Sequence, residues 1–511
     1  MPVLQRTKDK LQFAFEKPDL NQLIDEGSTP MQLYKLINKL DFSAFYAKHS
    51  STGAPNYPPE DMMAVVMLAF SEGIFSSRKI EEKCQRDIYY MFLTEQRKPD
   101  HSTIARFIQK YKEEIPVLGV QVVLFARKHK IATYETISID GSKFAAATSK
   151  KHSKNSKNLE RHEKYLQKKL EETLKKVEET DRQETEALAK LRKVEKSVKG
   201  KLERTQKAKI ELSKRKAEIK EKKHRENHQI NIEEPEARMM QSIATSGYNP
   251  QLSVDTATGI IVAQSITVSR SDNHEFSPQH KKTEEVLGAD KTRAYVADSG
   301  YNSEETLEYI QKHEVEAYIN DAREKEKQAS VEELVKRNKS LTIYDFVFDK
   351  EKNVFLCPNQ KYLIETENQV YACHECEGCA LLRLCCRKKG EKKITKTSFT
   401  LLREAMSEKM KENKKEKMNQ RKTVERSFGQ MKWNLGFRRF HRKGIVGASV
   451  ELNLLALSIN MAKIIAIFYT FFVLRLVRKN IYRIIRAISN YLVSNTNHVI
   501  FPRQQPHVQV G

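Results

Sequence analysis

The sequence has no run of about 20 apolar residues, the length that a helix needs to cross a membrane. The segment Ile464–Leu474 comes nearest, but it has only 11 residues and stands between Lys463 and Arg475. We therefore expect a buried core helix there and no membrane partner. Residues 1–20 carry charges but no continuous apolar segment of the secretory type, which favours a cytoplasmic protein.

Cysteine is scarce outside one short window. Five of the seven cysteines fall within it: Cys373, Cys376, Cys379, Cys385 and Cys386. In a reducing cytoplasm such a group indicates metal ligation sooner than disulfides. Tetrahedral Zn²⁺ needs four ligands, which Cys373, Cys376, Cys379 and Cys385 would supply. Iron–sulfur ligation and unligated thiols in a small β insert are the alternatives.

Acidic residues are also fewer than basic ones. The 511 residues include 91 Lys and Arg against 67 Asp and Glu, a formal charge of +24. Such an excess, on a chain with ample apolar residues for a core, points to a polyanionic partner, with nucleic acid first and an anionic membrane surface second. The length predicts two to four domains.

Residues 1–125 read as an all-helical domain. Short helices alternate with tight polar turns, and Ser102 is the expected N-cap of the helix after Pro99. Outward-facing Arg78, Lys79 and Arg106 suit a DNA-binding module of the helix-turn-helix kind. A plain helical bundle explains the pattern almost as well.

Strand and helix patterns alternate after this region, which predicts an α/β fold with a mixed sheet flanked by helices. In TISIDG, Thr136 and Ser138 alternate with two isoleucines, and the strand ends at Asp140. A second strand ends at Asp298, followed by a glycine turn and a helix capped by Ser303. A lone Asp at such a place is usually a turn former.

Two acids at strand ends and a helical Glu425 are a different matter. Carboxylates brought close together repel one another unless they share protons or cations. Two Mg²⁺ ions bridged by such groups form a device for attack on a phosphodiester, and Mg²⁺ needs few protein carboxylates.

The stretch MNQRKTVERSFGQMKW places Arg421, Glu425 and Lys432 on one stripe of a helix. For an arbitrary sequence this would be a salt bridge on a solvated surface. Here the segment resembles the Tyr-Arg-Glu-Lys signature of bacterial insertion-sequence transposases of the DDE class. Met418 stands at the Tyr position, so a hydroxyl that could contact phosphate is missing.

The resemblance extends over most of residues 15–465. YETISIDGSKFAA is similar to the first-Asp segment of these enzymes, AYVADSGYNSEETLEYI to the second, and PDHSTIARF to the end of their helical N-terminal domain. A Cys-bearing insert before the Glu helix is typical of the subgroup. The resemblance implies an RNase H-like core, with Asp140, Asp298 and Glu425 binding two Mg²⁺ or Mn²⁺ ions and with Arg421 and Lys432 on the DNA backbone.

This resemblance divides the chain into parts. The expected parts are an all-helical domain (1–125), an RNase H-like core (130–148 and 232–335), a charged coiled-coil insert (149–231), a β and Cys-rich insert (336–400), the Glu helix with a core helix (401–465) and an apolar, basic tail (466–511). The coiled-coil pattern breaks at Thr180–Thr185 and near Gly200. This insert either contacts DNA or a second subunit, or is a solvated spacer.

Three basic or aromatic positions follow the signature. Arg438 and Arg439 belong to a basic cluster that we expect to contact phosphates. Trp433 is expected to be buried under the Glu helix, with stacking on an unpaired base as the alternative.

The predicted function is that of a transposase. It would bind the terminal inverted repeats of its own element as a homodimer on double-stranded DNA, cleave the ends and join the 3′-hydroxyls to target DNA. The rivals are an RNase H-like nuclease that cuts without joining, for example an inactive or repurposed relative, a DNA-binding regulator whose acids form turns and caps, and a membrane-attached coiled-coil protein.

Overall fold

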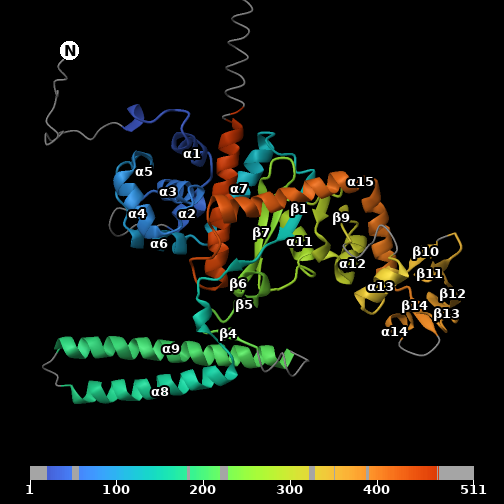
Figure 1. Cartoon of the computed structure of the whole chain (residues 1–511). Coiled ribbons are helices and arrows are strands. Elements are labelled where there is room, and N and C mark those ends of the chain that lie inside the picture. The colour runs from blue at the N-terminus through green and yellow to red at the C-terminus, as the bar shows by residue number, and fades with distance from the viewer. Residues whose placement is uncertain are drawn as a thin grey trace, which may run out of the picture.

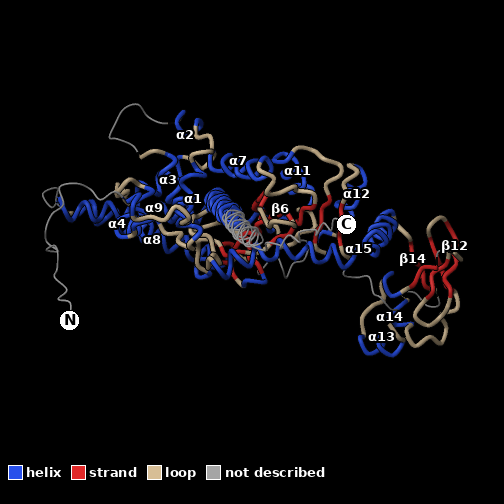
Figure 2. Tube along the Cα trace, turned by 90° about the horizontal axis from the view of Figure 1, so that it is seen from above, coloured by secondary structure: helices blue, strands red, loops and turns tan. Residues whose placement is uncertain are grey.

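The computed structural model describes residues 20–48, 57–180, 185–218, 228–321, 329–349, 351–386, 391–468 and 470. Figure 1 shows an N-terminal group of helices, a central sheet and a second, smaller sheet, with a helical hairpin projecting from the centre. Figure 2, seen from above, again places the smaller sheet apart at one end. The N-terminal 19 residues and most of the expected C-terminal tail lie outside the described residues.

Seven α-helices precede the first strand in the described part of the chain. They are α1 (Thr29–Ile37), α2 (Ser43–Ala47), α3 (Pro59–Ser71), α4 (Ser77–Arg86), α5 (Ile88–Leu93), α6 (His101–Lys110) and α7 (Glu114–Lys128). α3 is buried along almost its whole length and forms the centre of this group. The sequence predicted Ser102 as the N-cap of α6, but the N-cap is Asp100. The Asp100 carboxylate accepts a hydrogen bond from the Thr103 N–H at 2.8 Å.

The central sheet has five main strands in the order β7-β6-β1-β8-β9. Their bounds are β1 (Thr136–Gly141), β6 (Thr245–Asp255), β7 (Ile261–Thr267), β8 (Ala294–Ala297) and β9 (Ala317–Ile319). The first three form an antiparallel meander, while β8 and β9 are parallel to β1. The expected mixed sheet is therefore present, and its four strands other than β6 end at one edge. A turn at Thr258 and Gly259 joins β6 to β7, with Gly259 at φ +72°.

Helices cover both faces of this sheet. Ser138 is fully buried on the face that meets α15 (Ser398–Gly429), and its hydroxyl donates to the Arg421 carbonyl at 3.0 Å. Ser253, on the opposite face, accepts from Thr283 of α11 (Phe276–Leu287) at 2.7 Å. The alternation in β1 correctly predicted a strand, but no face of it is solvated, because Ser138 is as buried as its isoleucine neighbours.

Three further elements are two short strands that pair with β6 and a helix after Ser303. β2 (Phe144–Ala145) and β5 (Arg238–Met240) pair with β6. The predicted helix is α12 (Glu304–Lys312), and Ser303 caps it by accepting from the Thr306 N–H.

The charged region contains a helical hairpin of α8 (Ser156–Glu179) and α9 (Thr185–Glu218). A two-stranded ribbon of β3 (Ser153–Lys154) and β4 (Ile230–Asn231) joins it to the body. The expected break near Gly200 was wrong, because α9 continues through that residue. An isolated glycine costs a helix only about 1 kcal/mol relative to Ala.

The second sheet is antiparallel, in the order β10-β11-β12-β13-β14. Its strands are β10 (Val347–Asp349), β11 (Val354–Leu356), β12 (Tyr362–Glu367), β13 (Val370–Cys373) and β14 (Lys392–Thr395), with α13 (Val331–Arg337) and α14 (Leu382–Cys385) beside them. It has a hydrophobic core of its own, separate from that of the central sheet.

α15 runs from the second sheet back across the central sheet (Figure 1). A helix of Gly444–Phe468 follows, which by length and composition alone could cross a membrane. Its residues are instead largely buried in the described structure, and the Asn460 side chain pairs with both backbone groups of Ile261 on edge strand β7. The expected burial is therefore confirmed as far as Ile465, whereas Ala466 and Phe468 are exposed and residues 471–474 lie outside the described residues.

Candidate active site

Asp140 and Asp298 occupy matching positions on neighbouring strands. β1 and β8 are parallel, and Ile139 is paired with Ala297. Asp140 follows Ile139 and Asp298 follows Ala297, so both carboxylates lie at the same edge of the sheet. Parallel register thus brings together two residues that are 158 positions apart in the sequence.

Glu425 reaches the same edge from α15. The helix is fixed across the sheet by the contact of Ser138 with the Arg421 carbonyl and by Thr423, whose hydroxyl donates to the Thr256 carbonyl at 3.3 Å. Val424 and Phe428 are buried against the core. The opposite face of the same turns therefore carries Glu425, whose side chain is 44% exposed.

Arg421 links two of the three acids. Its Nη1 lies 2.8 Å from Glu425 Oε1 and 3.4 Å from Asp298 Oδ1. Its Nε is buried and has no hydrogen-bond partner among the residues that the structure describes. One guanidinium thus bridges the helix and the strand edge and keeps one donor unused.

Asp140 experiences the acidity of the site most strongly. Burial raises the pKa of Asp140 to about 7, and the nearby carboxylates of Asp298 and Asp272 add to this, while the Gly141 N–H and Arg421 oppose it. The Gly141 N–H donates to Asp140 Oδ1 at 2.7 Å. The carboxylate therefore lies in a poorly solvated, anionic position that a cation would stabilise.

Lys432 supports the segment after Asp140. It lies in a π-helical turn, Gln430–Asn434, so it leaves the α-helical stripe of Arg421 and Glu425 that the sequence predicted. Its ammonium donates to Ser142 Oγ at 2.7 Å and to the Lys143 carbonyl at 3.0 Å. Burial lowers the pKa of Lys432.

A fourth acid, Asp272, was missed from sequence. It accepts hydrogen bonds from Lys143 at 3.0 Å, Asn249 at 2.7 Å and Gln251 at 2.8 Å. The signal was available, because β7 runs parallel to β1 and Asp272 follows β7 at the same edge of the sheet as Asp140. A Cβ on Gly141 would lie 2.5 Å from Asp272 Oδ1, so this network needs glycine after the first acid.

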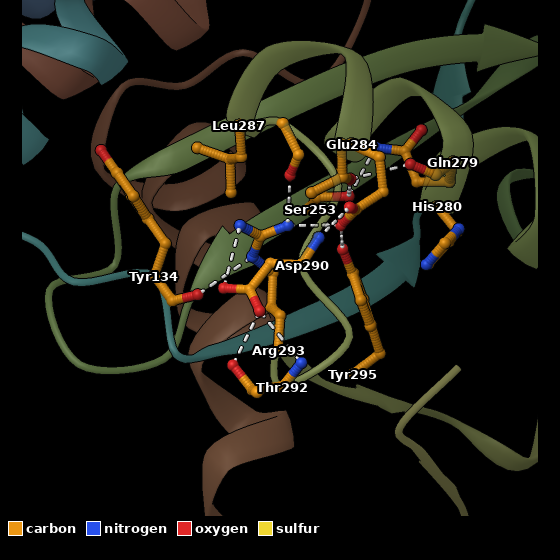
Figure 3. Close-up of polar contacts among 12 residues, drawn as sticks. Tyr134, Ser253, Gln279, His280, Glu284, Leu287, Asp290, Thr292, Arg293 and Tyr295 are labelled. Atoms are coloured by element: carbon orange, nitrogen blue, oxygen red, sulfur yellow. Dashed lines mark hydrogen bonds and ion pairs between the residues drawn. The ribbon is translucent and has the colours of Figure 1, made fainter. Parts of the chain in front are cut away.

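A buried polar network fixes the other end of β8 (Figure 3). Arg293, only 3% exposed, is paired with Glu284 of α11 and donates to the carbonyls of Tyr134 at 3.2 Å and Gly288 at 3.0 Å. Tyr295 also donates to Glu284. These contacts tie β8 to α11 and β1, and so fix the strand from which Asp298 emerges.

The predicted basic residues take different positions. Arg78, Lys79 and Arg106 are all exposed on α4 and α6, which pack together. Arg439, expected to contact phosphates, instead donates to the carbonyls of Ala146 and Thr148, at 3.2 and 2.9 Å. It therefore stabilises the backbone that follows β2.

Trp433 is not buried, contrary to the sequence prediction. Its side chain is 71% exposed, and the Arg438 guanidinium lies 4.2 Å from the ring centroid. The π-helical turn, which follows directly on α15, shifts the register by which the sequence placed Trp433 under the helix.

The residues described contain no three His, Cys, Asp or Glu side chains already grouped as a metal site. The three predicted acids nevertheless suit a hard divalent cation, because they are oxygen donors at one edge and Asp140 carries uncompensated acidity. The four predicted cysteines lie around one small cavity, together with Cys357 and Cys386.

Two family models match the chain. Residues 18–110 match a transposase domain, DUF772, and residues 351–465 match a transposase DDE domain that contains Glu425. Asp140 and Asp298 lie between the two matches. No curated protein and no solved structure matches.

The two matches define the class of protein: a transposase, which acts on DNA. More particularly, the chain is an insertion-sequence transposase of the DDE class, a metal-dependent enzyme that cleaves DNA. The resemblance to this family is thereby confirmed, while the signature residues and the two Asp segments, which lie between the matches, stay predictions.

Proposed function

We propose that this transposase binds the terminal inverted repeats of its own element, cleaves DNA there and joins the freed 3′-hydroxyls to target DNA. The observation that carries the proposal is the meeting of three sequence-distant groups at one sheet edge. Asp140 and Asp298 follow paired residues of β1 and β8, and Arg421 connects Asp298 to Glu425.

We assign the catalytic core to the RNase H-like fold. The strand order β7-β6-β1-β8-β9, with an antiparallel meander followed by two parallel strands, supports this assignment. The helical hairpin and the second sheet are then insertions into the core. Long insertions of this kind add little closure entropy, so they are compatible with one site.

Asp140, Asp298 and Glu425 would hold two Mg²⁺ or Mn²⁺ ions. When bound, the ions lower the pKa of the attacking water or 3′-hydroxyl and stabilise the leaving oxygen. In cleavage, a water oxygen forms the new bond to phosphorus, the P–O3′ bond breaks, and the products are a 3′-hydroxyl and a 5′-phosphate. In joining, the 3′-hydroxyl attacks a target phosphodiester and releases another 3′-hydroxyl.

The cations around the acids would contact DNA. Arg421 is assigned to a phosphate oxygen close to the acids that it joins, since guanidinium donors bind phosphate with defined geometry. Lys432 is also assigned to the DNA backbone. Its ammonium holds Ser142 and Lys143, the segment that follows Asp140. Exposed Arg438 and the N-terminal Arg78, Lys79 and Arg106 extend the basic surface.

Joining two element ends requires two protomers, so we assign a homodimer on double-stranded DNA as the active species, in the cytoplasm. We propose no membrane partner, because the described apolar helix packs largely within the hydrophobic core.

The test uses purified full-length protein, a DNA duplex carrying an element end, and Mg²⁺. Asp140→Asn, Asp298→Asn and Glu425→Gln should each lower cleavage by at least about 10³-fold, the range seen when a group essential to the transition state is lost. DNA affinity should change little. Glu412→Gln is the control, because Glu412 is an exposed acid on the same helix.

Near wild-type nicking by any of the three variants would show that its residue is not a ligand. Joining is tested separately with pre-cleaved ends: the proposal requires branched strand-transfer products, whereas a nuclease that only cuts would leave the target DNA unchanged.

A further inference from the structure

Six of the seven cysteines surround one cavity in the second sheet. The cavity measures about 20 Å³, room for about one water-sized sphere. It is lined by Cys357, Cys373, Cys376, Cys379, Cys385 and Cys386. All six thiols are free.

The thiols come from three separate pieces of backbone. Cys357 follows β11, Cys373 ends β13 and leads into the turn with Cys376 and Cys379, and Cys385 ends α14. The four ligands predicted from sequence come only from the last two pieces. Strand pairing in the second sheet adds Cys357, which is 16 residues earlier than Cys373.

The turn at Cys357 is shaped to hold its sulfur. Cys357 N–H donates to the Lys361 carbonyl at 2.8 Å, and the Lys361 N–H donates to Cys357 Sγ at 3.2 Å. Gln360 adopts φ +59°, which lets the chain fold back over the sulfur. Backbone N–H groups that point at a sulfur stabilise a thiolate, the form in which cysteine binds metal.

The surroundings also compensate the charge of a metal–thiolate centre. Zn²⁺ with four thiolates has a net charge of 2 − 4 = −2. Lys392 lines the same cavity; Lys361 also lines it, but its Nζ is already paired with Glu375 Oε2 at 2.8 Å, so Lys392 is the cation that would offset this charge. Lys392 donates to the Cys385 carbonyl at 3.1 Å, and so is held beside the thiols.

We propose that the second sheet contains a structural Zn²⁺ site in which Cys357 is one ligand and three of the five clustered cysteines are the others. The described side chains are not yet grouped as a metal site, so the ligands reach the ion by rotating about their Cα–Cβ bonds into the cavity they share. Zn²⁺ is favoured over Mg²⁺ because the donors are sulfur.

The site would act on stability. The core of the second sheet has only ten buried apolar residues, two of them Cys373 and Cys376. Cores of this size are commonly completed by a metal or by disulfides. The ion would tie Cys357, β13 and α14 together, and α15 starts directly after β14. This inference does not depend on the proposed cleavage chemistry, because its test uses no DNA.

The experiment measures metal in the full-length chain. Protein prepared with Zn²⁺ should retain about one ion per chain after desalting, and a thiol-blocking mercurial should release it. Cys357→Ser should lower the retained zinc at least tenfold. Cys84→Ser is the matched control, since Cys84 is the one cysteine outside the cavity, buried on α4, and its loss should leave the zinc content unchanged.

A second measurement covers the case in which Cys357→Ser does not fold. Co²⁺ loaded in place of Zn²⁺ should give the absorption of a tetrahedral thiolate site, and Cys357→His should still bind it while losing about a quarter of the sulfur-to-metal charge-transfer intensity. Retention of no tightly bound metal would overturn the proposal. So would full zinc in Cys357→Ser, or iron with acid-labile sulfide in place of zinc.

Discussion

Arg421 Nη1 donates to Glu425 Oε1 at 2.8 Å, one helical turn along α15, and so the signature pair is a direct ion pair. On a solvated helix such a pair would contribute a few tenths of a kcal/mol. Here the arginine is only 14% exposed and also faces Asp298. The pair therefore belongs to the candidate site. Its loss should lower the rate of DNA cleavage more than it lowers the free energy of unfolding.

Arg421→Ala should lower cleavage by about 10- to 100-fold, the size expected for a lost charged contact of 1.5–3 kcal/mol. It should also move the acid limb of the pH–rate profile to higher pH, because Arg421 lowers the pKa of Asp140. Rates across pH measure both effects. Arg426→Ala, an exposed arginine on the next turn, is the control, and an identical profile for the two variants would contradict the assignment.

Asp140→Asn should stabilise the metal-free protein at high pH. The folded-state pKa of Asp140 is about 7, against about 3.9 for an unperturbed Asp. Between these values the folded protein holds a proton that the unfolded chain has released, so the free energy of unfolding falls as pH rises and stays low above pH 7. Removing the carboxyl removes this loss.

The measurement is the thermal midpoint of wild type and Asp140→Asn with a chelator present. We expect the two curves to agree near pH 4, and the variant to melt higher at pH 8. Equal midpoints at both pH values would mean that Asp140 is not destabilised by its surroundings. Added Mg²⁺ should raise only the wild-type midpoint, because ligand binding to the folded state stabilises it.

Trp433→Ala should weaken DNA binding without affecting the fold. The ring is exposed and lies beside Arg438, and stacking of a base on an aromatic ring contributes about 1–3 kcal/mol. We expect a 5- to 150-fold loss of affinity for DNA with unpaired bases at the end, and an unchanged melting temperature. Tyr362→Ala removes an exposed aromatic ring on the second sheet and is the control. It should leave both the DNA affinity and the melting temperature unchanged.

Arg293→Ala should destabilise the whole central sheet. It leaves Glu284 mostly buried without its cation and removes the donors that join Tyr134 and Gly288 (Figure 3). Breaking such a buried pair costs about 3–5 kcal/mol. Urea unfolding measures this loss. Lys291→Ala, whose partner Glu314 is exposed, should change stability by less than about 0.5 kcal/mol.

The sequence predicted the strands that end at Asp140 and Asp298 because each has a local signal. Alternation marks β1, a glycine turn follows Asp298, and Ser303 caps α12. Residues whose placement depends on strand pairing were harder to predict. Asp272 belongs to the site only because β7 is parallel to β1, and Cys357 joins the other thiols only through the order of the second sheet.

Backbone irregularity caused the remaining errors. The π-helical turn at Gln430–Asn434 exposes Trp433 and turns Lys432 toward Ser142, and regular helical geometry cannot anticipate either outcome. Gly200 gave the opposite error, since a break was expected where the helix continues.

α15 has a mechanical consequence. About 40 Å of helix separates its first residue, beside the second sheet, from Glu425. At Asn413 the backbone leaves helical geometry, with φ −126° and ψ 19°. The helix therefore consists of two segments that meet at Asn413, one beginning beside the second sheet and one carrying Glu425, so that the backbone at this one residue sets the direction from which Glu425 approaches the central sheet.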